Sequence, residues 1–360
     1  MLLIPDSLTH STEGIAGYIN ASFTNQGNKA RAIFVWIANN ILYDLENEYS
    51  FIYFKDSREA VDIVLKTKKG VCTNYAELFT AIANQVGIKS YVISGLSKQN
   101  GTIDSNSHAW CAANIDSAWY LFDPTWGSGN IRNAKYIKKL NNLYFKTKPE
   151  EFIKTHMPFD PLWQFLNYPL TTRDFYQGKD SINKIKPYFN YRDTLYKFEH
   201  DTEIEKWVSC AKRIEGNGVI NMIILERLND VKKKIDYFTN KMVMEQYFES
   251  EKLYNEGIKQ FNRFVEYRNQ QFTPEMPDKL ITQMIDSAEY FFNNSKFKLR
   301  EIKHPNSSMV TAIIELDWTN DDALVNLKEH KVFLERYLQT DKTLRKALFY
   351  KHIWMGKTLN

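Results

Sequence analysis

Apolar residues in the first part of the chain recur every three or four positions, which is the spacing of amphipathic helices. The pattern predicts a helix from Lys29 to about Asp44, a second over Arg58–Thr67 with Ser57 as its N-cap, and a third from Cys72 to Gly87. The apolar face of the third helix contains Tyr75, Leu78, Phe79, Ile82 and Val86. A loop with many aromatic residues is expected between the first two helices, at Tyr49, Phe51, Tyr53 and Phe54.

Beyond Gly87 the apolar period changes from about 3.6 to about 2, which indicates β-strands. Strands are expected at residues 89–95, 108–115 and 118–123. A polar loop is expected over Gly101–Asn106, and a hairpin turn at Asp116-Ser117.

The length of this hairpin loop determines the position of Asp123. With a two-residue loop, Asp123 lies opposite Trp110 and diagonal to His108. With a four-residue loop, Asp123 lies directly opposite His108. Both registers place the two side chains on the same face of the sheet, because side chains alternate with a period of two.

The second half of the chain is predicted to be mostly helical. Residues 149–170 contain four prolines among aromatic residues and are expected to wrap the core irregularly. From Glu203 onward the apolar stripes have helical spacing, with a break at Gly216–Gly218 and a last helix that begins after a cap at Thr319 or Asn320. The whole pattern predicts an α+β fold, with helices packed on an antiparallel sheet and a mostly helical C-terminal region.

Composition narrows the class of protein. A chain of 360 residues is long enough for two domains, and its 43% apolar content excludes a disordered chain. The net charge of +4 gives no reason to expect nucleic acid or an anionic membrane as the main partner. No apolar run approaches the roughly 18 residues of a transmembrane helix, and Met1–Ile4 is too short for a signal peptide. The compartment stays open: cytoplasmic or, if an export signal was removed, periplasmic or extracellular.

Three residues have the chemistry of a catalytic triad. Cys72 lies at the predicted start of the third helix, whose partial positive charge favours the thiolate. His108 would act as the base, and Asp123 would orient the imidazole and stabilise its charged form. The backbone N–H of Cys72 is a candidate donor to the oxyanion of a tetrahedral intermediate.

The other cysteines and histidines show no comparable pattern. Cys111 and Cys210 are interpreted as buried structural residues. The chain has no CxxC pair and no metal-ligand spacing, so neither a structural metal nor a cofactor is expected. His156 has no visible partner in the sequence and is left unassigned.

Several motifs resemble those of the transglutaminase-like superfamily of papain-related folds, whose pattern is G-x-C at a helix start, then H-A-W, then D-P-T. Here these motifs read Gly70-Val71-Cys72, His108-Ala109-Trp110 and Asp123-Pro124-Thr125. The stretch Trp36–Asp44 and the stretch His156–Gln164 are similar to motifs of the branch that includes the kyphoscoliosis peptidase. The resemblance covers roughly residues 28–170.

This resemblance implies a papain-like core and carries over Cys72, His108 and Asp123 as nucleophile, base and orienter. Together with the element pattern, it leads us to expect an N-terminal arm at 1–27, a transglutaminase-like catalytic domain at 28–175 and a mostly helical domain at 176–360. Six residues before Cys72, where papain-type enzymes keep an oxyanion glutamine, this chain has Lys66. Candidates for oxyanion or substrate contacts are therefore left open, at Trp36, Asn40, Tyr43, Trp110 and Trp126.

Three functions remain in competition. The leading hypothesis is a thiol-dependent hydrolase, a peptidase or amidase that acts on a protein or peptide through a thioester. The second is acyl transfer to an amine, as in a transglutaminase, although no dense carboxylate cluster for calcium flanks the core. The third is a non-catalytic binding or scaffold protein on the same fold. The sequence determines neither the substrate nor the oligomeric state.

Overall fold

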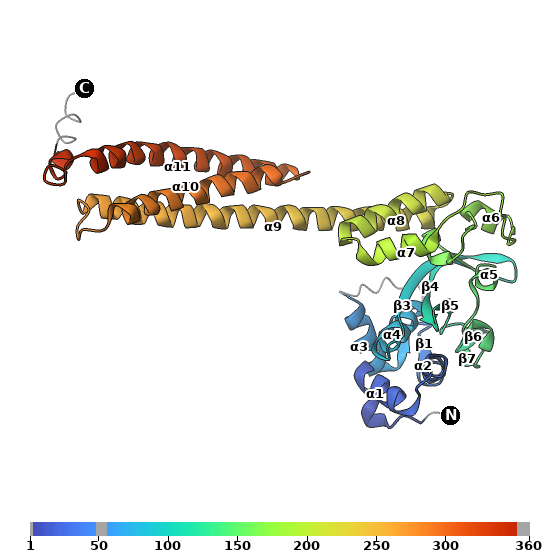
Figure 1. The fold of residues 1–360 in the computed structure, drawn as a ribbon. Helices are drawn as coiled ribbons and strands as arrows, with labels where there is room; N and C mark the ends of the chain where they lie inside the picture. Colours follow the sequence, from blue (N-terminus) through green and yellow to red (C-terminus); the bar gives the residue numbers. More distant parts are fainter. Residues whose placement is uncertain (1–2, 48–55, 351–360) are drawn as a thin grey trace. The chain divides into compact units, whose positions relative to one another are not determined.

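The computed structural model describes residues 3–47 and 56–350 (Figure 1). The chain divides into two compact units, Met1–Lys233 and Lys234–Asn360. The domain boundaries predicted after residues 27 and 175 both lie inside the first unit. The predicted aromatic loop at Tyr49, Phe51, Tyr53 and Phe54 lies outside the described residues.

The main sheet is preceded by the α-helices α1 (Thr12–Ser22), α2 (Gln26–Asn40), α3 (Ser57–Thr67) and α4 (Cys72–Gln85). The predicted arm at 1–27 contains α1, whose Ile15 and Ile19 are fully buried. The prediction of Ser57 as an N-cap is wrong, because the Asp56 side chain accepts the Glu59 N–H and Ser57 is already helical.

The main sheet consists of β3 (Ser90–Gln99), β4 (Thr102–Ile115), β5 (Ala118–Phe122) and β8 (His156–Pro158), in the antiparallel order β5-β4-β3-β8. The polar loop predicted over Gly101–Asn106 is wrong. The chain turns at Asn100-Gly101, where both residues have positive φ, and β4 begins at Thr102. The predicted turn at Asp116-Ser117 is confirmed, with φ of 51° and 66°.

The two faces of this sheet have different neighbours. Ala109, Cys111 and Ala113 join the core that α4 shares with α1, α2 and α3, as Figure 1 shows for the helices beside the sheet. Ile93, Trp110, Ala112 and Leu121 join a second, aromatic cluster. His108 is two residues from Trp110, and Asp123 is two residues from Leu121. Because side chains alternate with a period of two, His108 and Asp123 point to this same second face.

The remaining elements of the first unit are short, apart from α8 (Glu203–Asn217). The break predicted at Gly216–Gly218 is confirmed, since α8 ends at Asn217 and Gly218 has a φ of 105°. The other elements are η1 (Asp6–Leu8), β1 (Leu42–Tyr43), β2 (Lys69–Gly70), β6 (Gly129–Arg132), β7 (Lys135–Lys138), η2 (Asn142–Tyr144), α5 (Pro149–Phe152), η3 (Pro161–Gln164), α6 (Thr172–Tyr176) and α7 (Tyr191–His200).

Helix α9 (Met222–Asn269) begins in the first unit and continues into the second, which also contains α10 (Asp278–Glu301) and α11 (Ser307–Gln339). The cap predicted at Thr319 or Asn320 is wrong, because α11 begins after Asn306 and runs through both residues. Asn320 is buried, and its amide donates to Ser295 Oγ and to the Leu316 carbonyl. Among the described helices, none combines the length and the hydropathy that a membrane crossing requires.

Candidate active site

Cys72 is the first residue of α4, and neighbouring residues fix that position. The Asn74 side chain accepts the Val71 N–H at 3.0 Å and donates to the Ala60 carbonyl at 3.1 Å, which ties the helix start to α3. A Cβ at position 70 would lie 2.7 Å from the Cβ of Asn74, so only glycine fits there. Cys72 is half-buried, whereas Cys111 and Cys210 are buried.

His108 and Asp123 are brought together by the β4–β5 hairpin. Cys111 pairs with Phe122, a register that places Asp123 opposite Trp110, as the two-residue loop predicts. His108 Nε2 lies 2.8 Å from Asp123 Oδ2, and both residues are buried. Asp123 Oδ1 accepts the backbone N–H groups of Thr125 at 2.8 Å and Trp126 at 3.0 Å, which holds the carboxylate in place.

The Cys72 thiol lies close enough to His108 for the imidazole to lower the pKa of the thiol. Because Nε2 of His108 faces Asp123, Nδ1 is the nitrogen that faces the sulfur. The backbone N–H of Ala109 also points to the sulfur. The structure therefore brings the three predicted triad residues together, with His108 between Cys72 and Asp123.

The charges of Cys72, His108 and Asp123 favour a thiolate–imidazolium pair. Burial raises the pKa of Cys72, but the hydrogen bond and charge of His108 and the Ala109 N–H outweigh it, so the thiol pKa lies below its ordinary value. Burial lowers the pKa of His108, but the charge and hydrogen bond of Asp123 hold it well above the usual range. Despite its burial, Asp123 has a pKa well below its ordinary value because of its contacts with His108 and His156.

His156 is a residue of this site that sequence reasoning left unassigned. Its Nε2 lies 3.2 Å from Asp123 Oδ2, and its Nδ1 lies 2.8 Å from the Thr155 hydroxyl. Burial lowers the pKa of His156 to about 4, so the ring is neutral near pH 7. The neutral ring donates from Nε2 to Asp123 and accepts from Thr155. In the sequence, the only indication that His156 belongs to the site was the similarity of His156–Gln164 to a family motif. That similarity did not identify Asp123 as its hydrogen-bond partner.

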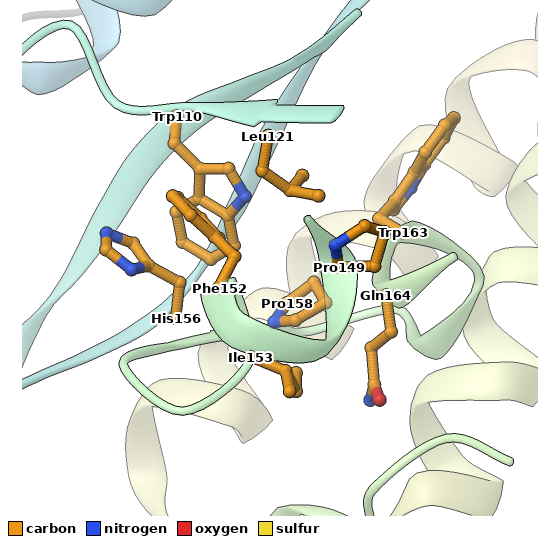
Figure 2. Close-up of a pocket in the computed structure, with 9 residues that line it drawn as sticks. All are labelled: Trp110, Leu121, Pro149, Phe152, Ile153, His156, Pro158, Trp163 and Gln164. Atoms are coloured by element: carbon orange, nitrogen blue, oxygen red, sulfur yellow. The ribbon is translucent and has the colours of Figure 1, made fainter. Parts of the chain in front are cut away.

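Aromatic rings enclose the two histidines. Trp126 stacks on His108 with ring centroids 5.2 Å apart, and Phe152 stacks on His156 at 4.0 Å. Trp110 lies 6.1 Å from His108 and 5.1 Å from His156. Figure 2 shows Trp110, Phe152 and His156 around a cavity of about 10 Å³, which has room for no more than about one water molecule. This cavity is too small for a substrate group.

The five candidate contact residues occupy different places. Trp126 and Trp110 lie beside the histidines, but the indole N–H of Trp110 is buried and does not face solvent. Trp36 is buried in the core, and the Asn40 amide donates to the Trp36 carbonyl at 2.8 Å. The Tyr43 ring lies 6.4 Å from the Tyr75 ring and 5.9 Å from the Tyr136 ring. The second oxyanion donor thus stays a prediction without an assigned residue.

His108, Asp123 and His156 also have the ligand types of a metal site. Within residues 3–47 and 56–350, they are the group whose possible ligand atoms all lie within 4.8 Å of one another. Nε2 of each histidine already contacts Asp123 Oδ2. Because these contacts join all three residues, we interpret the group as a hydrogen-bond network.

Comparison with known proteins shows what this part of the chain is similar to. Residues 13–124, which include all three triad residues, match the model of the transglutaminase-like superfamily. Kyphoscoliosis peptidase of Mus musculus is 34% identical over 170 residues, which are 43% of this chain and 25% of that protein. Hillarin of Drosophila melanogaster is 29% identical over 172 residues, 42% of this chain and 20% of that protein. The chain thus spans about a quarter or less of the length of these relatives.

Two solved structures are also similar to this chain. A TGase is 22% identical and covers 37% of this chain and 35% of its own, with a TM-score of 0.26. The periplasmic domain of TgpA from Pseudomonas aeruginosa is 18% identical and covers 32% and 42%, with a TM-score of 0.27. From its sequence matches, the chain carries a transglutaminase-like domain within residues 13–124 and is similar to the kyphoscoliosis peptidases.

Proposed function

We propose that this domain is a thiol-dependent hydrolase, a peptidase or amidase, in which Cys72 is the nucleophile. The observation that carries the proposal is that His108 is hydrogen-bonded to Asp123 and lies close enough to Cys72 to lower the pKa of its thiol. Acyl transfer needs a thiolate, a proton donor for the leaving group and a group that orients that donor. The pKa of Cys72 is lowered, that of His108 is raised and that of Asp123 is lowered, as a nucleophile, a proton donor and an orienting carboxylate require.

In the first half of the reaction, the Cys72 thiolate attacks the carbonyl carbon of an amide and the carbonyl oxygen takes the negative charge. The backbone N–H of Cys72 lies in the first turn of α4, where it has no partner within the helix and can donate to that oxygen. The His108 imidazolium then gives its Nδ1 proton to the amine nitrogen. The C–N bond breaks, the amine leaves, and a thioester remains on Cys72.

In the second half, neutral His108 takes a proton from a water molecule whose oxygen attacks the thioester carbonyl. The C–S bond breaks, the carboxylic acid leaves, and the thiolate–imidazolium pair is restored. Asp123 stays ionised throughout and stabilises the imidazolium each time it forms.

The reactivity of the thiol tests the first requirement. Alkylation of the full chain by iodoacetamide near pH 7, followed by peptide mass spectrometry, should modify Cys72. Cys111 and Cys210 should stay unmodified, since both are buried and burial raises the pKa of both thiols.

The pH dependence of this alkylation adds a control. In the unsubstituted chain the rate should rise at a pH below the ordinary thiol pKa of about 8.5. In His108→Ala the rise should move to or above that value, and Cys111→Ala should behave as the unsubstituted chain. A rate that first rises near pH 8.5 with His108 present would count decisively against an activated thiol.

The family match also favours a second reaction, transfer of the acyl group from the thioester to an amine. Casein incubated with a biotinylated pentylamine distinguishes the two. Incorporation of the amine identifies a transferase, whereas new amino termini or free ammonia without incorporation identify a hydrolase. Cys72→Ala should abolish each of these products, and product formation in that variant would refute both reactions.

A further inference from the structure

A second cavity, of about 340 Å³, lies within the first unit, and none of the triad residues lines it. Its walls come from β3, from η3 and the two residues before it, and from helices α7, α8 and the start of α9. The volume lies within the range of about 300–1,000 Å³ that small-molecule sites occupy. The cavity is therefore large enough for a ligand, in contrast to the small space beside His156.

Most of the cavity wall is apolar and aromatic. Trp163 and Phe198 meet edge to face with ring centroids 5.2 Å apart, and Tyr91 lies 5.0 Å from Trp163. Ile93 and Ile214, each about 1% exposed, contribute aliphatic surface from β3 and α8. Such walls favour an apolar group with a flat or extended shape.

The charged residues of the wall leave one positive charge uncompensated. Asp160 receives two bonds of 2.7 Å from the Arg213 guanidinium, so its charge is paired. Glu203 and Lys206 form an ion pair at 2.9 Å. Within the described part of the chain, Arg227 forms no ion pair, and it lies close enough to Cys210 for its charge to act on that thiol. The guanidinium is thus available to an anion.

We infer that this cavity binds a small amphipathic monocarboxylate, with its alkyl or aryl body between the aromatic rings and its carboxylate on Arg227. The guanidinium fork matches the geometry of a carboxylate and bonds to it in a bidentate manner. A neutral ligand of the same shape would leave the Arg227 charge unpaired beside an apolar wall. The inference does not depend on any activity of Cys72.

Fluorescence of 1-anilinonaphthalene-8-sulfonate, an aromatic monoanion, tests the site on the full chain. The probe should bind at one saturable site, and decanoate should displace it. Decanol, which has the same chain length without the charge, should need at least a tenfold higher concentration, equivalent to about 1.4 kcal/mol.

Substitutions then locate the site. Arg227→Gln should remove the preference for decanoate over decanol while decanol still displaces the probe. Arg192→Gln is the matched control, because Arg192 is an exposed arginine of α7 outside the cavity wall. Ile214→Trp should fill the cavity and abolish probe binding, and its circular dichroism should show that it is folded.

Several results would overturn the inference. They are absence of saturable probe binding, equal displacement by decanoate and decanol, or an unchanged preference for decanoate in Arg227→Gln. The Arg227→Gln result stands even if Ile214→Trp fails to fold. Because Cys72 is unchanged in every variant, alkylation of Cys72 should continue normally, which separates failure of this site from failure of the proposed reaction.

Discussion

Asp123 is held between two imidazoles of different charge. His108, whose pKa is raised, donates to Asp123 Oδ2 as an imidazolium, while His156, whose pKa burial lowers to about 4, donates to the same oxygen as a neutral ring. Two positive rings around one buried carboxylate would repel each other. The neutral state of His156 thus lets Asp123 stabilise the charge on His108 alone while its position stays fixed.

We predict that His156→Ala slows the reaction of the Cys72 thiol and that His156→Gln largely preserves it. Alanine removes a donor to a buried carboxylate, a loss worth about 1–3 kcal/mol, whereas the glutamine amide can still donate. The expected decrease for alanine is about tenfold or more in the rate of iodoacetamide alkylation near pH 7. The pH profile for alanine should also shift toward higher pH. If alanine and glutamine behave alike, His156 does not act through a hydrogen bond to Asp123.

The titration of His156 predicts how folding stability depends on pH. Its pKa is about 4 in the folded chain and about 6.5 in an unfolded one, so between these values the unfolded state binds more protons. The free energy of unfolding should therefore fall as the pH falls from about 6.5 to 4. Urea unfolding in this window should show a weaker pH dependence in His156→Gln. An identical slope in both proteins would contradict the neutral state of the buried ring.

At the level of secondary structure, Gly95 is where β3, β8 and Trp110 come closest. A Cβ at this position would lie 2.1 Å from the Met157 carbonyl oxygen and 2.6 Å from the Trp110 ring. A side chain at position 95 would therefore collide with the backbone of β8 on one side and with a buried ring on the other. Because β8 carries His156, this close approach also sets the position of that imidazole.

We predict that Gly95→Ala destabilises the first unit by about 1–3 kcal/mol or more, as forced overpacking does. Gly17→Ala is the control, since a Cβ there meets no atom within 4 Å, and alanine should stabilise α1 by about 0.5–1 kcal/mol. Thermal unfolding of both variants measures the difference. A Gly95→Ala protein as stable as Gly17→Ala would show that β8 does not pack so closely.

The elements themselves were predictable to different degrees. The helix over Cys72–Gln85 and the turn at Asp116-Ser117 follow from local apolar spacing and from residues that accept positive φ. The extension of β4 back to Thr102 was not predictable, because Gly101–Asn106 is polar and its strand state comes from pairing with β3. Asn320 was likewise predicted as a helix cap because asparagine is a common capping residue. It lies inside α11 instead, where its amide bonds to Ser295 of α10, a contact that the local sequence does not reveal.

At the scale of the whole molecule, each unit has a hydrophobic core of its own. The first unit buries residues such as Phe79 and Ile82, and the second buries residues such as Phe292 and Leu327. We predict two unfolding transitions in calorimetry, since separate cores unfold as separate cooperative units.

Matched core substitutions assign the transitions. Leu327→Ala should destabilise one unit by about 2–5 kcal/mol, and Phe79→Ala should destabilise the other by about 3–5 kcal/mol. Cys72 alkylation should be unchanged in Leu327→Ala at temperatures where both units are folded. A single transition that both substitutions lower would contradict independent cores.

The sequence by itself determined the type of most elements, the place of Cys72 at a helix start and the shared face of His108 and Asp123, because these depend on periodicity and on one short turn. Only the tertiary structure decided that His156, 33 residues beyond Asp123, reaches the same carboxylate and stays neutral. It also decided that Arg227 lines an apolar cavity with β3. Such contacts join segments far apart in the chain, and burial, which sets their charge states, is a property of the folded molecule.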